Sequence, residues 1–271
     1  MDTKLTGKTR IESDLIGARE IPAEALYGVQ TLRGIENFSI SKFRLSEYPL
    51  FIKGLAITKM AAAMANFELG LLTVEQKDAI IAACGEILDG KHHDQFPVDM
   101  IQGGAGTTTN MNANEVIANR ALELMGHERG EYQYCSPNDH VNCSQSTNDA
   151  YPTAIHVGMY FKHLQLLPHL EELIASFRKK GEEFSQIIKM GRTQLEDAVP
   201  MTLGQTFNGF ASILQDEIAH LNEAAADFLV VNMGATAIGT GICAEPGYAE
   251  KCIAALREIT GWDIRLSSDL V

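Results

Sequence analysis

Three segments of the 271-residue chain concentrate hydroxyl and amide side chains where the sequence changes from loop to helix. They are residues 106–114 (GTTTNMNAN), 142–148 (NCSQSTN) and 191–194 (GRTQ). Nearly all of their polar side chains are uncharged, and Arg192 is the exception. A helix N-terminus offers unpaired N–H donors and a partial positive charge, and neighbouring hydroxyls add donors without a counter-charge. Such a surface is typical of a carboxylate site that stabilises further negative charge during a reaction.

A purely structural role also explains each segment when it is taken alone. Ser, Thr and Asn favour helix N-termini because their side chains accept hydrogen bonds from free backbone N–H groups. Asn110 and Asn114 equally fit the solvated face of a helix. The residues by themselves therefore leave capping and substrate binding open.

The helices that would position these segments follow from apolar spacing and from capping residues. We expect them at about 50–69, 73–88, 108–125, 147–188, 202–231 and 246–259. Thr73 to Gln76 has the form of a capping box. Pro168 should end or kink the fourth helix near Leu167. The other segments, 189–199 among them, are expected to be irregular, with no convincing strand, so the fold class is mainly α.

Composition and charge limit the kinds of partner. The net charge of −13 argues against a nucleic-acid partner, although a local site can still oppose it and bind an anion. The chain starts with polar residues, and its most apolar stretch, 50–67, is interrupted by Lys53 and Lys59 and is too short to span a bilayer. We therefore expect a cytoplasmic protein with no membrane partner.

Searches for a cofactor or metal motif are negative. Gly85 to Lys91 matches most of a phosphate-binding loop, but His92 replaces the Ser or Thr, and the segment ends a helix instead of following a strand. The glycines of 234–241 do not form a dinucleotide fingerprint, and the eight histidines show no metal-ligand spacing. The five cysteines contain no Cys-x-x-Cys pair, which indicates reduced thiols. We expect no cofactor and no metal.

Four segments in order along the chain resemble motifs of the aspartase/fumarase superfamily. They are 104–116, 138–153, 191–200 and 234–241. The resemblance extends from about Ile11 onward, and four ordered motifs are far more specific than any one alone. It implies an aspartase/fumarase-like, mainly α fold: a small N-terminal helical domain over residues 1–145, then the start of a long-helix bundle domain over 146–271.

Within the superfamily, two stretches resemble the aspartate ammonia-lyase (aspartase) branch. They are Ser146–Pro152 and Glu131–Tyr134, and fumarases usually carry a second Ser where Thr147 stands. The resemblance implies reversible elimination of ammonia from L-aspartate to give fumarate, through an aci-carboxylate intermediate. It also implies that no redox or organic cofactor is needed and that the full-length protein is a homotetramer.

The resemblance also implies roles for the matching residues. By motif position, Ser146 and Thr147 would bind the β-carboxylate of the dicarboxylate substrate. Thr107 and Asn148 would lie near the amino group, and Thr193 would contact the α-carboxylate.

The sequence departs from the family pattern in two places. Gln194 stands where many members have histidine, so it would orient the substrate by hydrogen bonds and would not act as a general acid. The family's serine loop, which supplies the catalytic base, has no match, because Ser267 and Ser268 are followed by Asp-Leu-Val. No catalytic residue is therefore assigned, and the base is expected beyond Val271. The alternatives are a fumarate hydratase-like lyase and a non-catalytic helical oligomerisation module.

Overall fold

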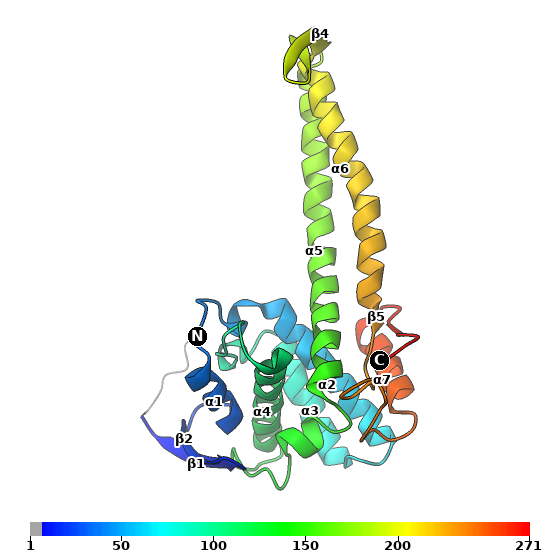
Figure 1. Cartoon of the computed structure of the whole chain (residues 1–271). Helices are drawn as coiled ribbons and strands as arrows, with labels where there is room; N and C mark the ends of the chain where they lie inside the picture. The colour runs from blue at the N-terminus through cyan, green and yellow to red at the C-terminus, as the bar shows by residue number, and fades with distance from the viewer. Residues whose placement is uncertain (1–6) are drawn as a thin grey trace. The chain divides into compact units, whose positions relative to one another are not determined.

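The computed structural model describes residues 7–271, and it confirms a mainly helical fold (Figure 1). The expectation drawn from the polar start of the chain falls partly on residues 1–6, which lie outside the described residues. Contacts along the chain define two compact units, one made of residues up to 159 together with 229–271, the other of residues 160–228. The division into domains 1–145 and 146–271 stays a prediction.

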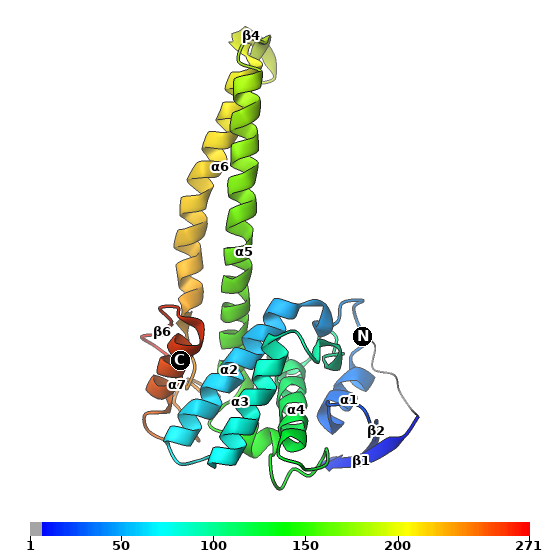
Figure 2. The same ribbon diagram turned by 180° about the vertical axis from the view of Figure 1, so that it is seen from behind.

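The first unit is built around packed helices. Its helices are α1 (Val29–Asn37), α2 (Pro49–Glu68), α3 (Val74–Leu88), α4 (Thr107–Leu124), the beginning of α5 (Thr147–Glu183), and α7 (Tyr248–Thr260). Helix α2 packs against α3 and α7, and α3 packs against α4, as both views show (Figures 1 and 2). The core between them is formed by fully buried aliphatic side chains that include Leu55, Ile80, Ile87, Ile117 and Leu122.

Helix α2 is apolar on all sides because other helices cover it. By length and composition it is apolar enough to cross a membrane, yet 67% of its most apolar window is buried within the fold. A Cβ at Gly54 would collide with the backbone carbonyl of Ala154 in α5, so glycine is required where these helices cross. We therefore interpret α2 as a core helix, and its buried Lys59 needs a specific explanation.

The predicted helix starts are confirmed by their caps. Thr73 Oγ1 accepts from the Gln76 N–H at 3.2 Å, and Gln76 Oε1 accepts from the Thr73 N–H at 3.1 Å. Thr202 and Gln205 form the same reciprocal pair at the start of α6 (Leu203–Ala226). Each pair satisfies the backbone N–H of the N-cap residue and the backbone N–H of the residue three positions later.

The expectation that no strands occur is wrong. Three short two-stranded sheets are present: β1 (Thr9–Asp14) with β2 (Gly17–Pro22), β3 (Ile188–Thr193) with β4 (Glu196–Thr202), and β5 (Val230–Val231) with β6 (Arg265–Leu266). The β3–β4 hairpin is largely exposed on both faces, so its sequence lacks the alternation that marks a half-buried strand.

The expectation that Pro168 ends or kinks the helix is wrong as far as an end is concerned. Helix α5 runs without interruption from Thr147 to Glu183. Proline removes one helical N–H, which leaves the carbonyl oxygen of residue 164 without its usual donor. Pro168 and Leu164 are both exposed, so water can satisfy that oxygen.

Candidate functional site

The N-terminus of α5 gathers the second predicted segment. Ser146 Oγ accepts from the Asn148 N–H at 3.2 Å, and the Ser146 N–H donates to Asp149 Oδ1 at 2.9 Å. Ser146 and Thr147 are partly exposed, whereas Asp149 is fully buried. The capping interpretation is therefore correct for Ser146.

Lys59 lies beneath this helix start and was not predicted as a site residue. Its Nζ donates to Asn110 Oδ1 at 2.7 Å, to Asn142 Oδ1 at 2.9 Å and to Gln145 Oε1 at 2.8 Å. Burial lowers the pKa of Lys59 to about 7, and the nearby Asp149 carboxylate opposes that shift. A lysine ammonium has three donors and no acceptor, so these three amide oxygens match it fully.

Asn110 joins the first predicted segment to the second. Its Nδ2 donates to Thr147 Oγ1 at 3.2 Å and to Asn142 Oδ1 at 3.1 Å. Asn114, one turn further along α4, also donates to Asn142 Oδ1, at 3.2 Å. Asn110 and Asn114 are buried, so they do not lie on a solvated helix face.

Thr107 begins α4, and its hydroxyl is already engaged. Its Oγ1 donates to the carbonyl oxygen of Gly104 at 2.6 Å. The neighbouring Gly106 has φ +95°, and a Cβ there would lie 2.6 Å from the ring of Tyr151 in α5. Only glycine permits this close approach, which brings the start of α4 against the first turns of α5.

The fourth predicted segment, 234–241, closes on the same helix start. Asp149 Oδ2 accepts from the N–H of Gly234 at 3.1 Å and of Thr236 at 2.9 Å. Asn148 Nδ2 donates to the carbonyl oxygen of Ala237 at 2.8 Å. Burial raises the pKa of Asp149, while its three backbone N–H donors and Lys59 favour the carboxylate.

Thr193 and Gln194 belong to the second unit. Thr193 pairs with Glu196 at the end of the β3–β4 hairpin, and the two residues between them, Gln194 and Leu195, have φ values of 45° and 70°. Two positive φ values mark the primed turn that suits a two-residue hairpin, where Asn-Gly is usual. Leu195 is 94% exposed, so the turn projects into solvent.

The structure therefore brings together Ser146, Thr147 and Asn148 with Asn110 and the 234–241 loop. It also supplies two residues that the sequence analysis did not assign, Lys59 and Asp149. The available signal for Lys59 was a charge inside an otherwise apolar helix, which is rare unless the charge is paired.

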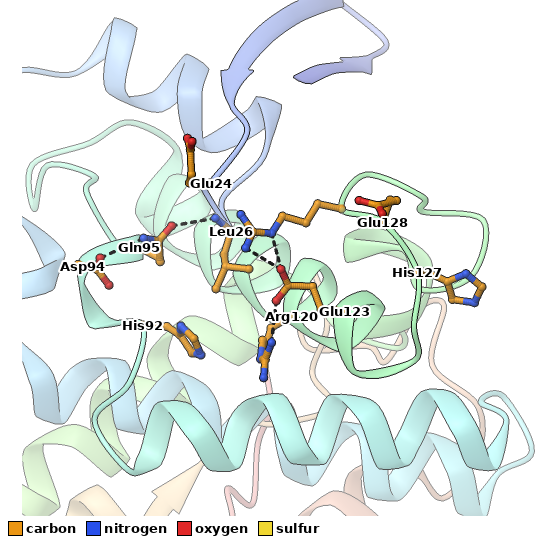
Figure 3. Close-up of a pocket in the computed structure, with 10 residues that line it drawn as sticks. Glu24, Leu26, His92, Asp94, Gln95, Arg120, Glu123, His127 and Glu128 are labelled. Atoms are coloured by element: carbon orange, nitrogen blue, oxygen red, sulfur yellow. Dashed lines mark hydrogen bonds and ion pairs between the residues drawn. The ribbon is translucent and has the colours of Figure 1, made fainter. Parts of the chain in front are cut away.

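A pocket of about 600 Å³ elsewhere in the first unit has a different character (Figure 3). Arg120 donates to Glu86 at 2.6 Å and to Glu123 at 2.7 Å, and Arg129 donates to the other oxygen of Glu123 at 2.6 Å. Its arginines are thus already matched by carboxylates, which makes it a poor carboxylate site. Among residues 7–271, no group of three or more His, Cys, Asp or Glu side chains is arranged to hold a metal ion.

Comparison with known proteins identifies the family of the chain. A family model described as "Lyase" matches residues 17–269. The chain is 55% identical over 263 residues to an aspartate ammonia-lyase of Pseudomonas canavaninivorans, covering 97% of this chain and 56% of that protein. It is 52% identical over 268 residues to an aspartate ammonia-lyase of Escherichia coli K12, covering 98% of this chain and 56% of that protein. The chain thus spans little more than half the length of these relatives.

Solved structures extend the comparison to the fold. A fumarate lyase:delta crystallin from Brucella melitensis bound to cobalt superposes with a TM-score of 0.95 at 52% identity, covering 97% of this chain and 57% of that one. A class II fumarase from Schistosoma mansoni superposes with a TM-score of 0.87 at 36% identity, covering 94% and 53%. With a family match over nearly its whole length, the chain belongs to this lyase family and has the fold of the fumarate lyases and class II fumarases.

Proposed function

We propose that the protein to which this sequence belongs is an ammonia-lyase that converts L-aspartate to fumarate, with the N-terminus of α5 holding a substrate carboxylate. The observation that carries this proposal is the direction of the hydrogen bonds at two hydroxyls. Ser146 Oγ and Thr147 Oγ1 each accept a hydrogen bond, from the Asn148 N–H and the Asn110 amide. The aspartate ammonia-lyases matched above support the choice of reaction.

A hydroxyl has one hydrogen, so the direction of its existing bond decides what it can still offer. Ser146 and Thr147 keep their hydrogens, because within residues 7–271 neither donates to a protein acceptor. Both stand at the positive end of a helix dipole. A carboxylate there would receive two O–H donors, and the same donors would stabilise the added charge of an aci-carboxylate.

Thr107 and Asn148 each offer an acceptor oxygen. Thr107 commits its hydrogen to Gly104, so its oxygen offers only lone pairs. Asn148 commits one of its two amide hydrogens to Ala237 and keeps its Oδ1 as an acceptor beside the other hydrogen. Two acceptors suit an ammonium group, which has three hydrogens to donate, better than a hydroxyl, which has one, and this favours an amino-acid substrate over a hydroxy acid.

We place the catalytic base outside residues 1–271. Lys59 is the buried cation next to the cluster, but its three N–H groups all point to amide oxygens, and it is fully enclosed. A Cβ–H bond is a very weak acid, so binding without a positioned base leaves a large barrier. The chain covers 56% of its relative, and we expect the base in a segment that corresponds to the part of the relatives outside the match.

The second unit would supply the α-carboxylate contact and the subunit interface. Gln194 and Leu195 hold positive φ values that cost roughly 1 kcal/mol each in non-glycine residues, and such strain is often kept for function. Exposed apolar side chains in this unit support burial against further copies in a cytoplasmic homotetramer. They include Leu164, Leu173, Phe210 and Ile213.

An assay by complementation tests this function. The chain is purified alone and then mixed with the part of an Escherichia coli aspartate ammonia-lyase that the match does not cover. We expect no turnover by the chain alone, and formation of fumarate from L-aspartate by the mixture. Faster consumption of malate than of aspartate would instead identify a fumarate hydratase. An assembled but inactive mixture would support a non-catalytic helical module.

A further inference from the structure

We propose that Lys59 is a positioning residue that fixes the direction of the Asn110–Thr147 hydrogen bond and so reserves the Thr147 hydroxyl hydrogen for a substrate carboxylate. This inference rests on the proposed function of the α5 N-terminus. It concerns the one hydroxyl of that site whose polarity is set by a side chain, since Ser146 accepts from a backbone N–H that cannot reverse.

Lys59 imposes an orientation because it can only donate. Its Nζ lies 2.7 Å from Asn110 Oδ1, and its other two hydrogens point to Asn142 and Gln145. If the Asn110 amide were turned over, its NH2 group would face the ammonium, donor against donor, in a fully buried position. That arrangement loses a charge-assisted hydrogen bond, so the oxygen of Asn110 must face Lys59.

The two other amides are held by independent contacts. Gln145 Nε2 donates to the carbonyl oxygens of Val141 and Cys143, at 2.9 and 3.0 Å. Asn142 Nδ2 donates to the carbonyl oxygen of Gln145 at 3.2 Å. Backbone carbonyls can only accept, so both amides keep their oxygens toward Lys59. The whole layer around Lys59 therefore has one polarity, with oxygens toward the ammonium and NH2 groups away from it.

The orientation of the Asn110 amide affects the site through its hydrogen bond to Thr147. With its oxygen on Lys59, Asn110 presents Nδ2 to Thr147 Oγ1 at 3.2 Å. Thr147 must then accept, and its hydrogen points away from Asn110. Asn142 Oδ1, which accepts from the same Asn110 Nδ2 at 3.1 Å, opposes reversal together with Lys59. A reversed amide would take the Thr147 hydrogen for itself, and Thr147 would offer a carboxylate only lone pairs. Lys59 thus acts on the substrate through Asn110 without touching it.

Asn110→Asp tests this chain of contacts. A carboxylate keeps the bond to Lys59 but has no hydrogen to give, so Thr147 would donate to the introduced carboxylate and lose its free hydrogen. We expect fumarate binding at pH 6, followed by NMR titration of the 271-residue chain, to weaken by about tenfold or more, as for loss of one charge-assisted donor. In a Thr147→Val background the same change should alter affinity by less than about twofold, because the hydroxyl is already gone.

Asn114→Asp is the matched control. It adds the same charge one turn along α4 and the same repulsion toward Asn142 Oδ1, but the Asn114 amide donates to Met111 and Asn142 and not to Thr147. We expect it to weaken fumarate binding by less than about threefold. Equal losses from the two Asp variants, or an Asn110→Asp loss that is the same with and without the Thr147 hydroxyl, would show that charge alone acts and would overturn the inference.

Neutron diffraction on deuterated crystals of the unmodified chain provides a test that needs no variant. We expect deuterium on the Asn110 nitrogen directed at Thr147, and the Thr147 hydroxyl deuterium directed away from it. A hydroxyl that donates to Asn110 would overturn the inference while leaving carboxylate binding by Ser146 intact. Failure of the unmodified chain to bind fumarate would instead overturn the site assignment, and this inference with it.

Discussion

Asn148 donates a hydrogen bond from Nδ2 to the carbonyl oxygen of Ala237 at 2.8 Å, although the two residues are 89 positions apart. The adjacent Asp149 holds the same loop through the N–H groups of Gly234 and Thr236. The orientation of a predicted substrate-binding amide thus depends on a loop from another part of the chain. Replacing a glycine of that loop therefore tests whether its conformation matters.

Gly234→Ala should destabilise the first unit and loosen this loop. Gly234 has φ +95°, and a Cβ there would lie 2.6 Å from that of Ala249. Gly247→Ala is the matched control, because Gly247 has φ +87° with nothing within 4 Å of an added Cβ. We expect the Gly234 variant to lose at least about 1 kcal/mol more in free energy of unfolding than the control, measured by urea denaturation. Equal losses would mean that only backbone strain matters.

Lys59→Met should destabilise the fold by roughly 2–5 kcal/mol, because the amide oxygens of Asn110 and Gln145 lose this donor and that of Asn142 loses one of three. Lys53→Met, on the same helix but only half-buried, should change stability by less than about 0.5 kcal/mol. Denaturant unfolding of both variants gives the comparison. Replacing a buried ion by an apolar side chain can also be neutral or stabilising. Such a result for Lys59→Met would show that the amides reorient freely.

The ion pair of Glu86 with Arg120 should make stability depend on acid pH. Hydrogen bonding from Arg120 lowers the pKa of Glu86 from 4.5 to about 2. The stabilisation is therefore complete above about pH 4.5 and is lost as the pH falls from 4.5 to 2. Glu86 is about a fifth exposed, so solvent screening limits the effect to roughly 1–2 kcal/mol.

Unfolding free energies at pH 5 and pH 2.5 test that window. The difference in unfolding free energy between pH 5 and pH 2.5 should be smaller by roughly 1–2 kcal/mol in Glu86→Gln. It should stay unchanged in Glu75→Gln, which removes an exposed carboxylate from the same helix. An unchanged difference in Glu86→Gln would contradict the assigned origin of the pKa shift.

The helices were predictable because they depend on local spacing and caps. Both boundaries of the helix expected at 73–88 agree with those of α3 to within one residue. Thr73 and Gln76 cap its start, and its buried positions recur at helical intervals. The β3–β4 hairpin was missed because solvent contacts both of its faces, so no alternation marks it. The continuation of α5 past Pro168 was not predictable, because the exposure that makes the missing hydrogen bond tolerable is a property of the fold.

The site was predictable in its residue types but not in its connections. Ser146 and Thr147 stand in a recognisable motif, whereas Lys59 had been interpreted only as an interruption of an apolar stretch. Its partners Asn110, Asn142 and Gln145 lie 51, 83 and 86 positions away, and nothing local in the sequence indicates these pairings. Long-range contacts of this kind emerge only when α2, α4 and α5 are packed together.

Thr147→Val should lower kcat/KM of the complemented enzyme by roughly 10²–10³, as removal of a preorganised oxyanion donor does. Thr153→Val is the control on the same helix, since Thr153 is buried and its hydroxyl has no partner among the described residues. It should leave the rate within about threefold, because a hydroxyl without a partner contributes little. Initial rates with L-aspartate give both values. If Thr147→Val also stays within that range, Thr147 is only a helix cap.

The central claim is that the start of α5 binds a carboxylate of the substrate. It is tested most directly by titrating fumarate into the isotopically labelled chain and following the backbone amide signals of Thr147 and Asn148 by NMR. We predict saturable shifts at these two residues that fumaramide, the neutral diamide of the same shape, does not produce. Absence of saturable shifts, equal shifts with the diamide, or shifts confined to the Arg120 pocket would contradict the account.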